Sequence, residues 1–197
     1  MHELIKMVVV LTVLSAFSGG LLAGLRNGTA AQIENQQLKF VKGPAIKSIL
    51  EGASNDPIVD RMKITDGDVE RSFFVGKFDG KANTIAFEDF GKGYGGDVGL
   101  MVGVNIETDE IIGVGVTTHS ETPGLGAQAK DKPNFVSQFK GFSIMDPVSV
   151  TADGGKVNAM SGATITSRAV CAAATQAGKA YEKLKPQLAE KLKAFNE

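Results

Sequence analysis

The sequence contains few of the residues that build metal centres and disulfides. Among its 197 residues there is a single cysteine, Cys171, only two histidines, and no tryptophan. One cysteine excludes an intramolecular disulfide and any all-cysteine metal site. Two histidines leave no ligand set within this chain for a histidine-rich metal centre or an iron–sulfur cluster. If the protein takes part in redox chemistry, it therefore needs an organic cofactor.

The sequence also has no large net charge of either sign. The chain has 21 Lys and Arg residues against 22 Asp and Glu residues, which gives a formal net charge of −1. This balance does not favour nucleic acid as a partner. No Gly-x-Gly-x-x-Gly segment opens a βαβ unit, so a Rossmann dinucleotide site is not expected. No nucleophile, base and orienting group form a recognisable set, and we assign no catalytic residue.

What is present, first of all, is one long apolar run. Residues 7–25 are uncharged and lie between Lys6 and Arg26. As a helix they rise about 28 Å, close to the ~30 Å hydrocarbon core of a bilayer. We interpret residues 1–28 as an uncleaved transmembrane anchor. A secretory signal peptide, with cleavage near Thr29-Ala30-Ala31, is the alternative.

A polar segment follows the anchor and leads to the remaining domain. Residues 30–50 predict a helix that is interrupted at Gly43-Pro44. We therefore expect a helical stalk and linker over residues 29–70. A folded domain is expected over residues 71–197.

The centre of the domain predicts antiparallel strands. The three expected hairpins join residues 71–78 to 82–87, 98–106 to 111–118, and 147–151 to 156–160. Asp79-Gly80 is a strong turn signal for the first of them. Strands joined by hairpins, with helices gathered at the two ends, are typical of α+β proteins. The predicted fold is an antiparallel, hairpin-built sheet with flanking helices, preceded by one transmembrane helix.

A cluster of hydroxyls and a glycine, Ser161-Gly162-Ala163-Thr164, precedes an alanine-rich run over residues 168–183 that predicts a helix. Pro186 is expected to end this helix. The first N–H groups of a helix lack partners within it, and its dipole adds positive charge, so this point suits a phosphate. The ordinary alternative is that Ser161 or Thr164 only caps the helix.

Two further glycine-rich segments lie before the cluster. Residues 119–126 read His-Ser-Glu-Thr-Pro-Gly-Leu-Gly and follow the last expected strand of the second hairpin. From the pattern alone this is an ordinary strand-to-helix loop. Residues 91–97 hold four glycines around Tyr94.

Together these segments resemble a known family. Asn158-Ala159-Met160-Ser161-Gly162-Ala163-Thr164 resembles the flavinylation motif of the FMN-binding domain that is shared by the G subunit of the Rnf complex and the C subunit of the sodium-pumping NADH:quinone oxidoreductase. Asn158 stands where an acidic residue is usual. The segment Glu121 to Gly126 resembles the family's second signature, and residues 91–97 resemble a third. The resemblance runs from about residue 73 to residue 183.

The resemblance implies that a flavin transferase attaches FMN covalently through its phosphate to Thr164. Ser161, Gly162, Ala163 and Thr166 would shape the phosphate end. Leu125, with Thr122 and Gly124, would pack against the flavin ring. The other residues expected at the site are Tyr94, His119, Glu121 and Gly126, with His119 and Glu121 making polar contacts or fixing the loop.

The resemblance also implies a role. It describes an electron carrier without stand-alone catalysis, working beside other membrane and redox subunits of an Rnf-type complex. Such a complex couples electron transfer between ferredoxin and NAD to Na⁺ or H⁺ translocation. The protein would lie in the inner membrane, with its C-terminal domain on the periplasmic side. The alternative is a membrane-anchored module that binds a phosphate-bearing ligand reversibly, without electron transfer.

Overall fold

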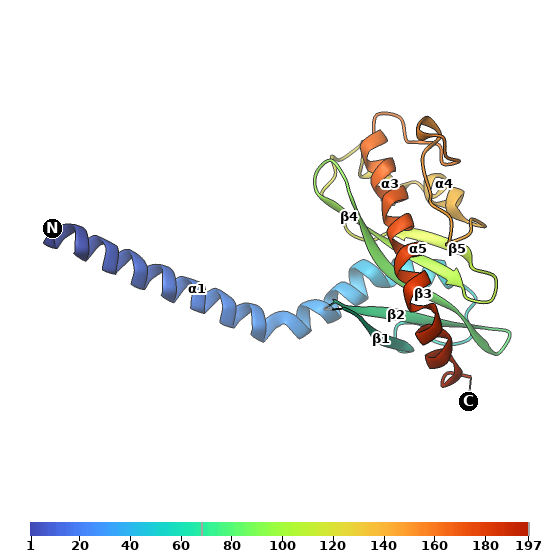
Figure 1. Cartoon of the computed structure of the whole chain (residues 1–197), viewed down its shortest axis with the longest axis horizontal. Coiled ribbons are helices and arrows are strands. Elements are labelled where there is room, and N and C mark those ends of the chain that lie inside the picture. The colour runs from blue at the N-terminus through green and yellow to red at the C-terminus, as the bar shows by residue number, and fades with distance from the viewer. Residues whose placement is uncertain (68, 197) are drawn as a thin grey trace. The chain divides into compact units, whose positions relative to one another are not determined.

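The computed structural model describes residues 1–67 and 69–196 and divides into two compact units, Met1–Lys39 and Phe40–Glu197 (Figure 1). The first unit is built on α1 (His2–Gln37), whose apolar side chains, such as Leu11, Leu14 and Phe17, are exposed. Among the described residues, the helix that begins with α1 is the one long and apolar enough to cross a membrane. Its length and composition make it a candidate membrane span, as the sequence predicts.

The interruption expected near Gly43-Pro44 is a π-helical turn. The turn is η1 (Leu38–Lys42), and α2 (Gly43–Ile49) follows it directly. Pro44 lies in the first turn of α2, where its missing N–H leaves no intrahelical bond unmade. The break therefore falls just before the proline.

The described residues of the second unit form one antiparallel sheet of five strands. They are β1 (Arg61–Asp66), β2 (Val69–Phe78), β3 (Lys81–Lys92), β4 (Asp97–Asn105) and β5 (Glu110–Val116). Their order in the sheet is their order in the chain. The predicted α+β class and the first two hairpins are confirmed. Asp79 (φ 51°) and Gly80 (φ 76°) take the left-handed conformation that a tight hairpin turn requires.

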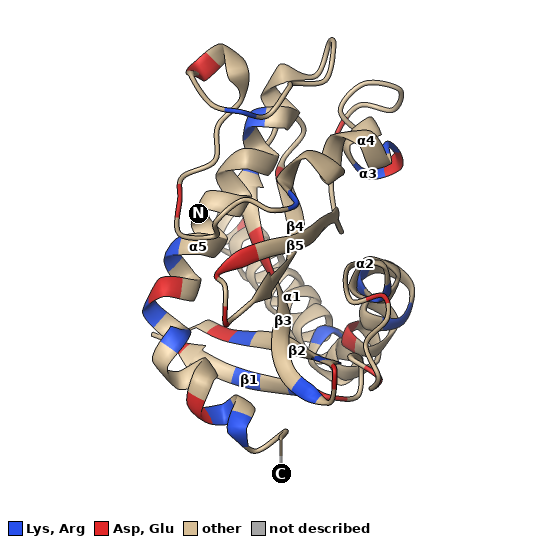
Figure 2. Cartoon of the chain, turned by 90° about the vertical axis from the view of Figure 1, so that its right-hand side faces the viewer, with Lys and Arg blue, Asp and Glu red and all other residues tan. Residues whose placement is uncertain are grey.

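Helices cover both faces of the sheet. Figure 2 shows α5 (Thr164–Lys193) on one side and α2 on the other. The inner face of α5 is formed by small residues over its first half and by Tyr181, Leu184 and Leu188 beyond them. These side chains share the main hydrophobic core with Phe73 and Phe87 of the sheet. The small residues let the first half of α5 lie close to the strands.

The prediction that Pro186 ends the last helix is wrong. Helix α5 continues through Pro186 to Lys193. Leu184, Leu188 and Leu192 are buried along one side of it, whereas Pro186 is exposed. Burial of these leucines in the core offsets the hydrogen bond that the proline cannot make.

The third predicted hairpin, over residues 147–160, is also wrong. This segment contains a 3₁₀ turn, η3 (Thr151–Asp153), and an isolated parallel bridge between Val150 and Val157. Both valines are fully buried in the same core as α5. The apolar pattern that suggests strands is therefore explained by the burial of an irregular loop. Residues 128–139, which precede it, form α3 (Gln128–Asp131), α4 (Pro133–Val136) and the 3₁₀ turn η2 (Ser137–Phe139).

Candidate functional site

A pocket of about 500 Å³ lies at the N-terminal end of α5. Three stretches that are far apart in the sequence meet there. The residues that line the pocket are Tyr94, Glu121, Thr122, Leu125, Gly126, Gly162, Ala163, Thr164, Ile165 and Thr166. Small-molecule sites typically have volumes of about 300–1,000 Å³. The pocket therefore brings nine of the twelve predicted site residues together in a cavity of ligand size.

The start of α5 carries no side-chain cap. Its N-cap residue is Ala163, and the N-cap side chain accepts no hydrogen bond from the first N–H groups of the helix. The alternative that Ser161 or Thr164 caps the helix is therefore wrong. Thr164 is exposed at the pocket wall. Uncapped N–H groups and the helix dipole leave this end suited to an anion.

The turn that leads into α5 is fixed by a residue absent from the predicted site. The hydroxyl of Ser167 donates to the carbonyl of Ala163 over 3.0 Å and accepts the N–H of Met160 over 2.9 Å. Ser167 is fully buried. It holds the motif turn in place from inside the protein, so Thr164 can face outward without a structural task. A serine in the first turn is the signal that was available in the sequence.

Glu121 joins the three stretches of the pocket. Its side chain is inside the protein, with the residue only 6% exposed. One carboxylate oxygen, Oε1, accepts the N–H of Gly95 over 2.7 Å, and the other, Oε2, accepts the hydroxyl of Thr166. Its own N–H donates to Nδ1 of His119 over 3.3 Å. Glu121 and Thr166 therefore satisfy each other's hydrogen-bonding groups, and Glu121 holds the loop at Gly95 and the start of α5 together.

The close approach around Glu121 requires glycine at position 126. A Cβ added to Gly126 would lie 2.5 Å from Thr166 Oγ1 and 2.7 Å from Glu121 Oε2. Real Cβ atoms do not come so near, and both oxygens belong to the same buried hydrogen bond. The second glycine of the Gly-Leu-Gly segment thus allows the loop to sit directly against the first turn of α5.

Apolar side chains form the outer rim of the pocket. Leu125 and Ile165 are about half exposed, and Tyr94 is largely exposed. A Cβ added to Gly162 would lie 3.2 Å from Leu125 Cδ2, which places the tip of the loop beside the turn that precedes α5. The sequence prediction omitted Ile165, because an apolar residue in the first turn of a helix reads as core.

Three predicted residues are not among those that line the pocket. His119 is partly buried and accepts the N–H of Glu121, and Gly124 accepts a hydrogen bond from the amide of Gln128. Ser161 lines a neighbouring depression together with Asn158 and Gln138. There the backbone of Asn158 donates to Gln138 Oε1 over 2.7 Å. These residues surround the pocket without facing it.

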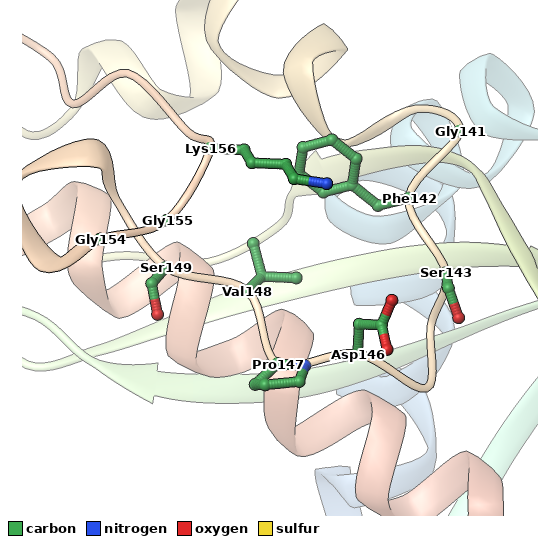
Figure 3. Close-up of a pocket in the computed structure, with 10 residues that line it drawn as sticks. All are labelled: Gly141, Phe142, Ser143, Asp146, Pro147, Val148, Ser149, Gly154, Gly155 and Lys156. Atoms are coloured by element: carbon green, nitrogen blue, oxygen red, sulfur yellow. The ribbon is translucent and has the colours of Figure 1, made fainter.

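Other features of the domain lie apart from this pocket. Burial, with a smaller contribution from Asp153, raises the pKa of the Cys171 thiol to about 12. Within the described residues, no group of three His, Cys, Asp or Glu side chains could hold a metal ion. A second cavity, of about 410 Å³, is lined by residues that include Phe142, Asp146 and Lys156 (Figure 3). None of its lining residues belongs to the predicted site.

The comparisons with known proteins fall on the same region. The family model described as FMN-binding domain matches residues 93–179, which include all three stretches of the pocket. The G subunit of the ion-translocating oxidoreductase complex of Methanosarcina acetivorans is 36% identical over 171 residues, covering 85% of this chain and 89% of the relative. The protein of the same name from Pseudomonas aeruginosa is 33% identical over 171 residues, covering 80% and 79%.

The chain belongs to the FMN-binding domain family. Two solved structures are also similar to the chain. The C subunit of the Na⁺-translocating NADH-quinone reductase of Parabacteroides distasonis is 29% identical, with a TM-score of 0.51 over 59% of this chain and 63% of that one. NqrC of Shewanella oneidensis is 25% identical, with the same TM-score over 72% of each chain. The pocket at the start of α5 is thus the site to test for flavin in this member of the FMN-binding domain family.

Proposed function

We propose that this protein is a membrane-anchored electron carrier that holds FMN covalently through the hydroxyl of Thr164. The observation that carries the proposal is the placement of Thr164. It is exposed on the wall of a cavity of about 500 Å³, at a helix N-terminus that no side chain caps. An exposed hydroxyl beside free N–H groups is the arrangement that a phosphate ester needs.

The residues of the pocket fit the two ends of FMN. The phosphate would sit at Thr164, where Gly162 and Ala163 bring backbone to the start of α5. The ring would lie against the apolar rim, on Leu125 and Ile165. FMN supplies the electron-transfer chemistry when it is bound. The chain itself holds and orients the cofactor, and its buried Glu121 keeps the loop closed against α5.

A covalent link would suit a carrier whose cofactor is hard to replace. It removes the dependence of occupancy on free flavin, because the ligand is no longer a separate molecule. We place the domain on the extracytoplasmic side of the inner membrane, anchored by α1. A flavin transferase would load it there. The apolar, exposed surface of α1 supports an anchor.

The names of the relatives support a place in a larger assembly. The two relatives described above, at 36% and 33% identity, are each named as the G subunit of an ion-translocating oxidoreductase complex. We propose that this chain is the corresponding subunit. It would pass electrons between other redox subunits of a complex that couples ferredoxin and NAD chemistry to Na⁺ or H⁺ translocation.

Denaturing-gel fluorescence combined with intact mass tests the proposal. The full chain and its Thr164→Val variant are each expressed with a flavin transferase, and Thr151→Val, at an exposed threonine outside the motif and the pocket, serves as the control. We expect a fluorescent wild-type band whose mass exceeds that of the chain by one FMN less one water. The band should persist in the control and disappear in Thr164→Val. A dark wild-type band, with flavin released on denaturation, would instead support the reversible phosphate-ligand module.

A further inference from the structure

On the α2 side of the sheet, four polar residues form a connected cluster that ends at the pocket loop. We call Lys42, Glu88, Thr117 and Lys130 the Glu88 cluster. Lys42 Nζ lies 2.6 Å from Glu88 Oε2, and the hydroxyl of Thr117 donates to Glu88 Oε1. Lys130 Nζ donates to the carbonyl oxygen of Thr117 over 2.9 Å. Elements η1, β3 and α3 and the residue that follows β5 therefore meet at this one cluster.

The centre of the cluster is buried. Thr117 is 1% exposed and the side chain of Glu88 is 10% exposed. A carboxylate taken out of water needs a cation and hydrogen-bond donors, and Lys42 and Thr117 supply them. Breaking such an arrangement by removing one partner costs more than breaking a surface pair, because the remaining group stays buried.

Strand β4 leaves the space that the cluster occupies. A Cβ added to Gly99 would lie 2.6 Å from the hydroxyl oxygens of both Thr117 and Thr118, and 3.1 Å from Glu88 Oε1. Any larger residue at position 99 would push these oxygens apart. The glycine thus makes room for the hydrogen bond between Thr117 and Glu88.

Two members of the cluster bracket the loop that lines the pocket. Thr117 follows β5 directly, Lys130 lies in α3, and between them stand Glu121, Thr122, Leu125 and Gly126. The hydrogen bond from Lys130 to Thr117 joins the two ends of this loop. The hydroxyl of Thr117 then fixes the joined ends to β3 through Glu88.

We infer that Glu88 and Lys130 are positioning residues for the flavin-facing loop. They touch no cofactor, but they set where Leu125 and Glu121 stand relative to α5. Lys42 lies near the start of the second unit, which begins at Phe40, and its ion pair with Glu88 attaches that start to β3. The consequence for the flavin rests on the proposed function. The consequence for the loop does not.

Hydrogen exchange of the full chain in detergent tests the loop without need of flavin. We expect Lys130→Met and Thr117→Val each to accelerate exchange of the amides at residues 119–127 by about tenfold, because each removes a partner from a partly buried hydrogen bond that holds the loop. Thr175→Val is the matched control. It removes a hydroxyl that accepts the N–H of Val148 over 3.0 Å, so its effect should be confined to that region. Unchanged exchange at 119–127 in both test variants would overturn the inference.

Flavin measurements then test the positioning of the cofactor. In Lys130→Met, with FMN content checked by intact mass, we expect a changed visible circular dichroism spectrum and a shifted midpoint potential. Lys130→Arg, which keeps the donor, should restore both. If the wild type carries no flavin, the proposed function fails while the exchange experiment still decides the role of the cluster. If flavin is present and unchanged in every variant, the inference about the cofactor is overturned.

Discussion

Glu121 and Thr166 are separated by 45 positions in the sequence and share a hydrogen bond in the interior of the protein. The same carboxylate also holds the N–H of Gly95. The pocket wall is therefore one hydrogen-bonded unit rather than three independent loops. This relationship makes the geometry around Thr164 depend on residues that do not face the pocket.

A double-mutant cycle on Glu121→Gln and Thr166→Val tests this unit. Each change alone should lower the free energy of unfolding by about 1–3 kcal/mol, because the partner stays buried without its bond. The double variant should lose less than the sum, with a coupling of about 0.5–3 kcal/mol. Urea denaturation of the wild type, the two single variants and the double variant measures these free energies of unfolding. Strictly additive losses would mean that the two side chains do not stabilise each other.

Asp109 should contribute to the loss of stability that occurs as the pH falls below 4. This residue, in the turn between β4 and β5, accepts hydrogen bonds from Tyr181 over 2.6 Å and from Lys185 over 2.6–2.7 Å. Burial acts to raise the pKa of Asp109, but the hydrogen bonds from Lys185 and Tyr181 outweigh it, and the pKa lies below its usual 3.8. The stabilisation is therefore complete above about pH 4 and is lost as the pH falls through the lower folded-state pKa.

Thermal unfolding of wild type and Asp109→Asn between pH 7 and pH 2 measures this contribution. At neutral pH the variant should be less stable by roughly 1–2 kcal/mol. The two curves should converge in acid, since the wild-type carboxyl group is then protonated and uncharged, like the asparagine amide. A constant gap down to pH 2 would assign the loss to packing instead. Asparagine is suitable for the test because, like Asp109 at φ 58°, it tolerates the left-handed conformation.

Cys171 should be inert in the folded protein. Its thiol is buried and its pKa is raised to about 12, so almost no thiolate exists at neutral pH. Incubation with a maleimide should leave the native mass unchanged and add one label after denaturation in urea. Rapid labelling of the native protein would show that the first half of α5 opens readily.

Replacing Pro186 with alanine should stabilise the domain. The proline lies inside α5 and is exposed, so it removes a helix hydrogen bond without contributing to the core. Allowing for the greater freedom of the unfolded alanine chain, the gain should be about 1 kcal/mol or more. The denaturation midpoint of Pro186→Ala decides this, and a lower midpoint would mean that the proline ring makes favourable contacts here.

The parts of the fold that the sequence predicts well are the local ones. The turn at Asp79-Gly80 carries its own conformational signal, and the strands on either side needed no distant contact to be recognised. Strand β1 was missed, because Arg61–Asp66 mixes charged and apolar residues and is recognisable as a strand only through its pairing with β2. The strand pattern over residues 147–160 misled for the opposite reason. The pattern comes from Val150 and Val157, which are buried in the same core as α5 and not in a sheet.

In the candidate site, too, the residues with a local sequence signal were predicted and those placed by distant contacts were not. Motif residues such as Thr164 and Leu125 were identified from the sequence by resemblance, and the structure brings them to one pocket. The bond between Glu121 and Thr166 had no local signal, since both residues belong to separate motifs. The Glu88 cluster had none either, because no motif contains Lys42, Glu88 or Lys130. Only the sheet register and the packing of η1 and α3 place them together.

The order of the elements along the chain has a consequence for how the protein matures. Each of the five strands pairs with its neighbour in the chain, whereas α5, which supplies Thr164 and a wall of the pocket, follows all five strands in the sequence. A chain in which α5 has not packed against the sheet lacks the wall of the pocket that carries Thr164. A modifying enzyme that reads this site would therefore need α5 to be packed against the sheet, and loading with the cofactor would distinguish chains that have folded this far from chains that have not.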